Sequence, residues 1–279
     1  MNDFIKAIKE SRTDLTDFLI HFTRQDKGLS AFQVLKKIIN DGYLQAGWSE
    51  RGLGLKKKRT VFGDTPAVCF TETPLYGFVD YAKKRNAKGS VDSYGIAFLK
   101  KNMWGRGCRP VIYGTTPYRV EQKNADGSIT IEGFAKEEQY RYILSAIDEK
   151  NDWTHEREWR WANPYGYSKI GGLPIWRTSE RSDWRFGDFY FIQSPIIVIV
   201  RVKKEKDELL EIFKKFGDEI KEEIRLKGSD KAETTLILSN INNTHILALE
   251  DCDFVSYPTY KIEDALKDRK LYPISPPPI

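Results

Sequence analysis

The chain has 279 residues, of which 40% are hydrophobic and 30% are charged, and its mean hydropathy is −0.53. This composition excludes an intrinsically disordered chain, and the length is sufficient to bury a large core. The formal net charge of +5 and the pI near 8.8 permit an anionic partner such as NAD or a nucleic acid, but do not require one.

Hydrophobic periodicity predicts helices and strands in the first half of the chain. The sequence Asn40-Asp41-Gly42 is a helix terminator, and Pro74 is typical of a helix start. A long stretch rich in Gly and Lys predicts a loop. The expected elements are an amphipathic helix at 2–18, a strand at 18–22, a helix at 31–39, the loop at 47–65, a strand at 66–71, a helix at 74–85, and strands at 94–99 and 110–113.

The second half of the chain shows the same mixture of patterns. The expected elements are a helix at 133–149, a strand at 154–161, a turn at 171–174, a short apolar segment at 189–191, a strand at 196–202, a charged helix at 207–225, strands at 234–238 and 245–249, and an extended tail at 273–278. Because strands and helices do not alternate strictly, the α+β class is predicted. We expect one domain, with a core at 1–200 and an α/β extension at 201–279 packed on it.

Several common site types are excluded by missing motifs. The chain has no G-x-G-x-x-G, no P-loop and no G-x-S-x-G motif, and its three histidines and three cysteines lack metal-ligand spacing, so no metal site is expected. The start of the chain lacks the apolar centre of a signal peptide, and no apolar run reaches the roughly 18 residues of a spanning helix. The odd cysteine count predicts reduced thiols, so a cytoplasmic protein without membrane association is expected.

Polar residues on three predicted strands are the remaining candidates for chemistry. They are His21 and Thr23 in LIHFT, Thr71 and Glu72 in VCFTETP, and the two glutamates of HEREW, Glu156 and Glu158. Residues two apart on a strand share a face, so Glu156, Glu158 and Arg160 are expected opposite Trp159 and Trp161. Taken alone, such a face is also typical of a surface ladder of acids and arginines.

The order of these strands resembles the ADP-ribosyltransferase superfamily, and the motifs IHFT, IINDGYL, VCFTETPL and YGIAFLKKNMWGRGCRPVIY resemble the abortive-infection AbiG family of phage-resistance proteins. EREWR is similar to a late strand of that fold. The resemblance covers about 19–113, and more loosely 150–161, and LIHFT is also similar to the start of DNA-modifying ADP-ribosyltransferase toxins. It implies an ADP-ribosyltransferase-like split, mixed or antiparallel β-sheet core with flanking helices.

The resemblance also implies roles for single residues, with NAD as the substrate. Glu158 would stabilise the oxocarbenium-like ribose, and Glu156 would orient or deprotonate the acceptor. The other expected NAD-binding residues are His21, Phe22 and Thr23 near the adenosine ribose, Phe70 and Thr71 at the nicotinamide wall, and Tyr81 stacked on the nicotinamide. The loop at 47–65, with its basic run at 56–59, would lie over the pyrophosphate or reach towards the acceptor.

The resemblance leaves three functions open. The first is a toxin that transfers ADP-ribose to a nucleic acid in phage defence, with an antitoxin protein as a further partner. A protein acceptor in place of the nucleic acid also stays open. Residues 70–72 read FTE where arginine-modifying relatives have Ser-Thr-Ser, so an arginine acceptor is not indicated. The second is a non-catalytic binding or antitoxin module of the same fold, and the third is an NAD hydrolase that needs no macromolecular acceptor.

Overall fold

The computed structural model describes residues 12–48, 50–51, 58–86, 92–114, 121–123, 125, 129–145, 153–162, 172–176, 195–227, 231–252, 254, 259–268 and 270–273. The chain divides into two compact units. Unit 1 comprises Met1–Tyr43, Glu72–Met103 and Pro174–Ile279, and unit 2 comprises Leu44–Thr71 and Trp104–Leu173. The division does not follow the expected boundary at residue 200, because residues on both sides of it belong to unit 1.

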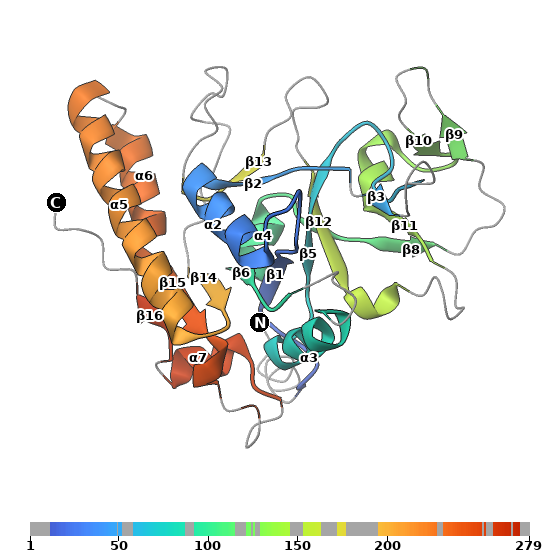
Figure 1. Cartoon of the computed structure of the whole chain (residues 1–279). Helices are drawn as coiled ribbons and strands as arrows, with labels where there is room; N and C mark the ends of the chain where they lie inside the picture. Colours follow the sequence, from blue (N-terminus) through green and yellow to red (C-terminus); the bar gives the residue numbers. More distant parts are fainter. Residues whose placement is uncertain are drawn as a thin grey trace, which may run out of the picture. The chain divides into compact units, whose positions relative to one another are not determined.

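Unit 1 is built on a mixed sheet (Figure 1). Its strands lie in the order β16 (Tyr272–Pro273), β15 (Thr244–Ala248), β14 (Ile196–Val200), β6 (Gly95–Leu99) and β1 (Phe18–Phe22). The pair β14–β15 is parallel, whereas β15–β16, β14–β6 and β1–β6 are antiparallel. Together with the helices around it, this sheet confirms the α+β class.

The helices of unit 1 cover both faces of this sheet. α3 (Leu75–Asn86) and α7 (Ile262–Lys267) share a hydrophobic cluster with Phe18, Ile197 and Leu247 of the strands. α5 (Lys203–Lys227) packs against β14, β15, α2 (Ala31–Asp41) and α6 (Lys231–Asn242). The short η5 (Leu249–Asp251) follows β15, and α4 (Lys100–Gly105) continues from unit 1 into unit 2.

Local sequence explains where α2 begins and ends. The Gln33 N–H donates to Ser30 Oγ at 3.3 Å and the Ser30 N–H donates to Gln33 Oε1 at 2.8 Å, which forms a capping box. At the other end, Gly42 adopts φ +78° and its N–H donates to the Ile38 carbonyl. Glycine accepts this left-handed conformation without steric cost, so the helix ends at the expected terminator.

Unit 2 has a smaller antiparallel sheet of β5 (Ala67–Thr71), β12 (Glu158–Ala162) and β7 (Arg109–Pro110), with β12 in the middle. Its other described strands form pairs: β3 (Glu50–Arg51) with β4 (Lys58–Arg59), β9 (Glu121–Lys123) with β10 (Ile129–Ile131), and β8 (Ile112–Gly114) in parallel with β11 (Tyr142–Leu144). Two 3₁₀ helices, η2 (Lys136–Arg141) and η3 (Thr154–Glu156), complete it. β2 (Tyr43–Gln45) and β13 (Gly172–Pro174) lie where the chain passes from one unit to the other.

The expected helix at 133–149 is wrong. Residues 136–141 form η2, and residues 142–144 form β11, which pairs with β8. The buried amide of Gln139 explains the change: it accepts from the Ile131 N–H at 2.7 Å and donates to the carbonyls of Ile131 and Phe134. These bonds satisfy backbone groups of a turn that a continuous helix would not contain. Residues 146–149 lie outside the described part of the chain.

Other expected elements are corrected in part. The expected strand at 234–238 lies inside α6, because Thr244–Ala248 takes the place beside β14, and the expected turn at 171–174 contains β13. The expected loop at 47–65 contains β3 and β4, with 52–57 outside the described residues. Of the expected helix at 2–18, residues 12–17 are not helical and residues 1–11 are not described; 189–191 and 274–278 are not described either.

Candidate active site

The expected site residues are divided between the two units. His21, Phe22, Thr23 and Tyr81 belong to unit 1, whereas Phe70, Thr71, Glu156 and Glu158 belong to unit 2. Each set is therefore described within its own unit.

In unit 1, the expected NAD-binding residues lie on two faces of β1. The Phe22 ring stacks on Phe78 of α3 with centroids 4.1 Å apart, and Tyr81 lies 6.3 Å from Phe22 on the same face. Strand alternation directs His21 to the other face. The hydroxyl and N–H of the buried Thr23 both donate to the Tyr94 carbonyl. The structure thus brings Phe22 and Tyr81 together, but not with His21.

In unit 2, a polar face forms where β5 and β12 pair. Glu158 lies opposite Thr71, and Arg160 lies opposite Cys69, in the antiparallel register. Residues directly opposite each other share a face of the sheet, so these four side chains lie together. We call Cys69, Thr71, Glu158 and Arg160 the polar face of β5–β12. It joins two residues expected from the sequence with two that were assigned no role in the chemistry.

Glu158 and Arg160 form a buried ion pair at the centre of this polar face. Arg160 Nε donates to Glu158 Oε1 at 2.8 Å, and the side chains are only 1% (Arg160) and 9% (Glu158) exposed. Arg160 Nη1 also donates to the Tyr140 carbonyl of η2 at 2.6 Å. Burial acts to lower the pKa of Arg160, but the charge of Glu158 and its hydrogen bond to the guanidinium outweigh burial, and the pKa is raised. The Arg160 guanidinium is therefore bound by the Glu158 carboxylate and by the backbone of η2.

The backbone groups and one carboxylate oxygen of Glu158 have fixed partners. Its N–H donates to the hydroxyl oxygen of Tyr113 at 3.0 Å, and its carbonyl accepts from the Val111 N–H at 3.0 Å. With the carboxylate bound to Arg160, the residue has little freedom to reorient. Such a preorganised carboxylate can stabilise a positive charge that develops beside it.

Glu156 reaches the polar face from a turn, so its expected placement on the strand is wrong. It ends η3, and the next residue, Arg157, adopts the left-handed conformation with φ +44°, before β12 begins at Glu158. The Thr71 hydroxyl donates to the Glu156 carbonyl at 2.6 Å and fixes this turn to β5. A positive φ in a residue other than glycine is uncommon and is favoured only when surrounding contacts impose it.

The charges of both glutamates act on the side chains of Tyr113 and Cys69. Burial raises the pKa of the Cys69 thiol, and the charges of both Glu158 and Glu156 add to this shift. Burial also raises the pKa of Tyr113, where both carboxylates again contribute. Glu156 and Glu158 therefore act on the same two side chains, although they do not share a strand face. Cys69 and Tyr113 lie within VCFTETPL and YGIAFLKKNMWGRGCRPVIY, but no role was predicted for either. The antiparallel register places Cys69 opposite Arg160, and the hydrogen bond from the Glu158 N–H identifies Tyr113.

Phe70 lies on the opposite face of β5 and does not line the polar face. It is buried and lies opposite Trp159 of β12 in the register. Trp159 and Trp161 share this aromatic face, as the alternation predicted, and both are buried. Phe70 is therefore a core residue on the face of β5 opposite to that of Thr71, and its expected role as a wall of the nicotinamide site stays a prediction.

Two further charged features have structural explanations. Glu72, whose role the sequence left open, accepts from Lys100 Nζ at 2.8 Å, and Lys100 also donates to the Thr16 carbonyl. Of the basic run at 56–59, residues 56 and 57 lie outside the described residues and Lys58–Arg59 form β4.

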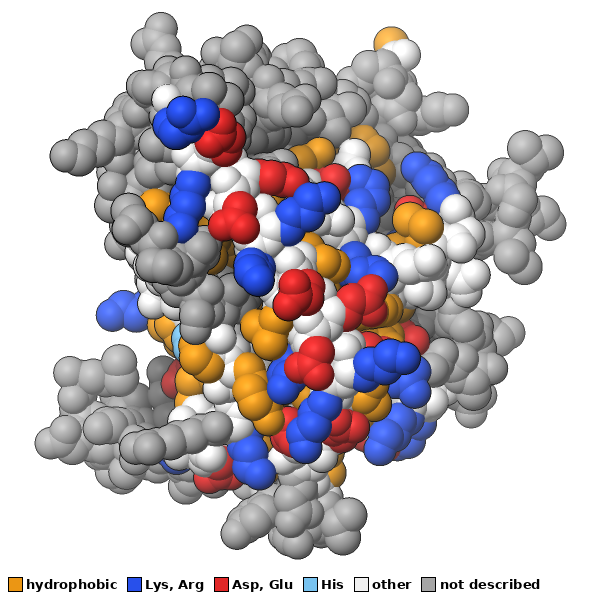
Figure 2. Space-filling model, turned by 60° about the vertical axis from the view of Figure 1, so that its left-hand side comes forward, with side chains coloured by type: hydrophobic (Ala, Val, Ile, Leu, Met, Phe, Trp, Pro, Cys, Tyr) orange, Lys and Arg blue, Asp and Glu red, His pale blue; other side chains and the backbone are white. Residues whose placement is uncertain are grey.

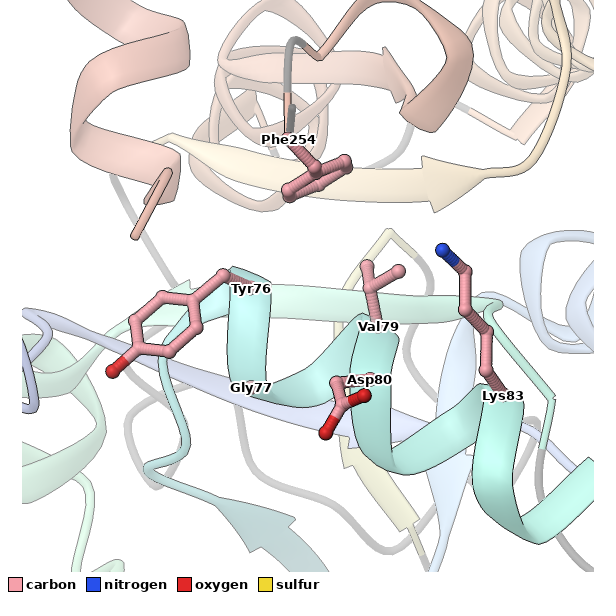
Figure 3. Close-up of a pocket in the computed structure, with 6 residues that line it drawn as sticks. All are labelled: Tyr76, Gly77, Val79, Asp80, Lys83 and Phe254. Atoms are coloured by element: carbon pink, nitrogen blue, oxygen red, sulfur yellow. The ribbon is translucent and has the colours of Figure 1, made fainter. Parts of the chain in front are cut away.

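A shallow groove of about 310 Å³ lies beside α3 in unit 1 (Figure 3). Val79 and Lys83 point from α3 towards Phe254, whereas the hydroxyl of Tyr76 points away. Asp80 forms its ion pair with Lys84 rather than with Lys83. Tyr81 does not line this groove, so it does not extend the expected nicotinamide site.

The exposed face over α5 carries charges of both signs (Figure 2). On this helix, Lys215 Nζ lies 4.0 Å from Glu219 Oε1, and Arg225 Nη2 lies 2.7 Å from Glu222 Oε1. Mixed charges of this kind are typical of a solvated helix. Within the described residues, no helix is long and apolar enough to cross a membrane, and no cluster of three or more His, Cys, Asp or Glu could hold a metal ion.

Comparison of the chain with protein-family models, with curated proteins and with solved structures finds no match.

Proposed function

We propose that the chain is an NAD-consuming ADP-ribosyltransferase that acts as a toxin in anti-phage defence, with a nucleic acid as the acceptor. The observation that supports it most is the polar face of β5–β12, where Glu158 is held by Arg160 and lies opposite Thr71. The resemblance of IHFT, VCFTETP and EREWR to ADP-ribosyltransferase strands supplies the reaction class and the ADP-ribosyltransferase-like split sheet.

The proposed reaction breaks the bond between the ribose C1′ and the nicotinamide nitrogen. The bonding electrons move onto the nicotinamide, which leaves as a neutral molecule, and positive charge develops on the ribose. The Glu158 carboxylate stabilises this charge without having to reorient, since Arg160 already holds it. The acceptor then donates an electron pair to C1′, and Glu156 takes the proton that the acceptor loses.

The turn at Arg157 gives the two glutamates different tasks. Glu158 lies on a strand and its own N–H and carbonyl are both hydrogen-bonded, whereas Glu156 ends a 3₁₀ helix and is only half-buried. The more rigid residue suits charge stabilisation, and the more accessible one suits contact with an incoming acceptor.

The buried ion pair also supports a rival, a non-catalytic binding module. Glu158 is only 8% exposed and Arg160 already neutralises it. Buried pairs of this kind occur as purely structural features, since removal of one partner leaves a costly unpaired charge. This rival predicts that NAD neither binds nor is cleaved.

The test is incubation of the full chain with NAD labelled in the adenosine part. Parallel samples contain no macromolecule, the nucleic-acid fraction of a cell extract, or its protein fraction. Wild type is compared with Glu158→Gln and with the matched control Glu137→Gln, which changes an exposed glutamate of η2 in unit 2. We expect nicotinamide release and label transfer to nucleic acid by wild type and control, and a loss of about 10²–10³-fold in Glu158→Gln.

Each alternative gives a distinct result. Absence of nicotinamide release and of an NAD-dependent thermal shift in wild type contradicts the proposal and favours the binding module. Free ADP-ribose in the sample without macromolecules indicates an NAD hydrolase, and label in the protein fraction indicates a protein acceptor. Full activity of folded Glu158→Gln would reject the assignment of that residue.

A further inference from the structure

Trp104, the first residue of unit 2 after the chain leaves unit 1, is an exposed aromatic side chain held in a fixed position. Its side chain is 51% exposed, the largest value among the exposed large hydrophobic side chains of the described residues. Its ring packs edge-on against Trp159 with centroids 6.1 Å apart, and the Arg109 guanidinium lies 4.1 Å from its centroid. The indole is thus rigid and accessible at once.

Arg109 is fixed as firmly as the ring that it covers. Its Nη1 donates to the carbonyls of Trp104 at 2.7 Å and Cys108 at 2.9 Å. A guanidinium in this position is attracted to the indole face and keeps donors available for an anion. Arg109 belongs to β7, the edge strand of the unit 2 sheet.

Two further arginines lie close to β7. Burial lowers the pKa of Arg106 to about 9, and no carboxylate of the described residues offsets this burial. The Arg106 carbonyl accepts from Trp161 Nε1 at 3.1 Å, which fixes the turn between α4 and β7. Arg141 Nε donates to the Pro110 carbonyl at 2.9 Å, and its other nitrogen pairs with Glu138. Within the described part of the chain, Glu138 is the carboxylate that pairs with one of these three arginines, which leaves an excess of positive charge there.

We infer that Trp104, Arg106, Arg109 and Arg141 form a surface that binds single-stranded nucleic acid, with an unpaired base against the Trp104 ring and phosphates at the arginines. We call these four residues the β7 surface. An aromatic platform beside a track of positive charge is the combination that single strands use, because every base has a stacking face and every nucleotide a phosphate. A duplex offers no free base face for such a ring.

The β7 surface borders the polar face of β5–β12. Arg109 lies opposite Arg160 in the register, whereas Trp104 packs on Trp159, whose side chain points to the face of β12 opposite to that of Glu158. The surface would hold the acceptor strand rather than NAD, since its aromatic ring lies away from the Glu158 carboxylate. Its role as an acceptor site rests on the proposed function, whereas binding itself does not.

The test measures fluorescence anisotropy of labelled single-stranded RNA and DNA oligonucleotides with the full chain at several salt concentrations. Trp104→Ala is expected to raise the Kd at least about fivefold, and Trp104→Phe to retain most of the affinity, because a phenyl ring still stacks. Arg106→Gln is expected to reduce the slope of log K against log salt by about 0.7. The matched controls are Leu144→Ala, an exposed hydrophobic residue of unit 2, and Arg225→Gln, an exposed arginine of α5, and neither should change binding.

The inference is overturned if wild type shows no saturable binding of either oligonucleotide, or if Trp104→Ala binds as wild type does. Loss of label transfer to a protein in Trp104→Ala, without oligonucleotide binding by wild type, would also overturn it, since the surface would then recognise a protein. Nicotinamide release is measured on the same samples. Oligonucleotide binding without NAD cleavage rejects the proposed function alone, and cleavage without binding rejects this inference alone.

Discussion

The central strands of the two units bury opposite kinds of side chain. All five residues of β14 in unit 1 are apolar and fully buried. β12 in unit 2 has the same length, yet it buries Glu158 and Arg160 beside Trp159 and Trp161. Both strands lie inside a sheet with a pairing partner on each side.

The two strands differ in whether the side chains that they bury are needed for the stability of the fold. Burying an aliphatic side chain stabilises a fold directly, whereas two charges taken out of water cost several kcal/mol each before their attraction compensates. A strand in the position of β12 could be apolar on both faces without losing the fold. The charged pair is therefore the feature of the sheet on which the proposed chemistry rests.

The largest expected effect on stability comes from breaking the buried pair. Arg160→Ala leaves Glu158 buried without its partner, so the free energy of unfolding should fall by about 3–5 kcal/mol. Urea denaturation measures the change. The double variant Glu158→Leu with Arg160→Met should recover most of this loss but remain inactive. Equal instability of the double and single variants would contradict the interpretation.

The matching change in unit 1 is Ile197→Ala in β14. It removes a fully buried side chain and should cost about 2–5 kcal/mol, since a cavity remains. NAD cleavage per folded molecule should be unchanged, because unit 1 contributes packing at this position. No partner substitution should rescue it, in contrast to Arg160→Ala.

A smaller effect is expected at the bond that fixes the Glu156 turn. Thr71→Val removes the hydroxyl that donates to the Glu156 carbonyl and should lower the free energy of unfolding by about 1 kcal/mol. The loss of activity should be larger than this loss of stability implies, because Glu156 is then poorly placed. Thr71→Ser, which keeps the donor, is the control. If Thr71→Val were as active as Thr71→Ser, the placement of Glu156 would have no part in the reaction.

The smallest effect concerns a feature that the units share, a buried thiol. Burial raises the pKa of Cys108 in unit 2, and burial raises the pKa of Cys252 in unit 1 to about 12. At alkaline pH the unfolded chain loses these protons while the folded chain keeps them, so stability is complete below pH of about 8.5 and falls above it.

For Cys108 this loss of stability amounts to about 1 kcal/mol at pH 9. The difference in free energy of unfolding between pH 7 and pH 9 should therefore be smaller by this amount in Cys108→Ala than in wild type. Parallel pH dependences in the two proteins would show that the thiol is ionised to the same extent in both states.

Local pattern predicted much of the structure. The strand at Phe18–Phe22, the helix that Ser30 caps and Gly42 ends, and the helix that begins after Pro74 are all confirmed. So is the aromatic face of Trp159 and Trp161. Cys69, Cys108 and Cys252 form no disulfide bond with one another. The pattern that predicts each of these elements lies in residues close together in the sequence.

The wrong predictions concern segments whose structure is determined by contacts with residues far away in the sequence. The periodicity of 133–149 predicted a helix, but the Gln139 amide bonds backbone groups of Ile131 and Phe134, and 142–144 pairs with β8. The glutamates were expected on one strand face, and the left-handed turn at Arg157 separates them. Neither interaction has a local signature.

By itself, the sequence determined which strands carry acids, tryptophans and aliphatic residues, because side-chain alternation is a property of any extended chain. Only the tertiary structure decided that Glu158 pairs with Arg160 opposite Cys69 and Thr71, and that the Thr71 hydroxyl joins the Glu156 turn to the same cluster. Register and burial depend on partners far away in the chain, and a charge becomes chemically informative only when its surroundings exclude water.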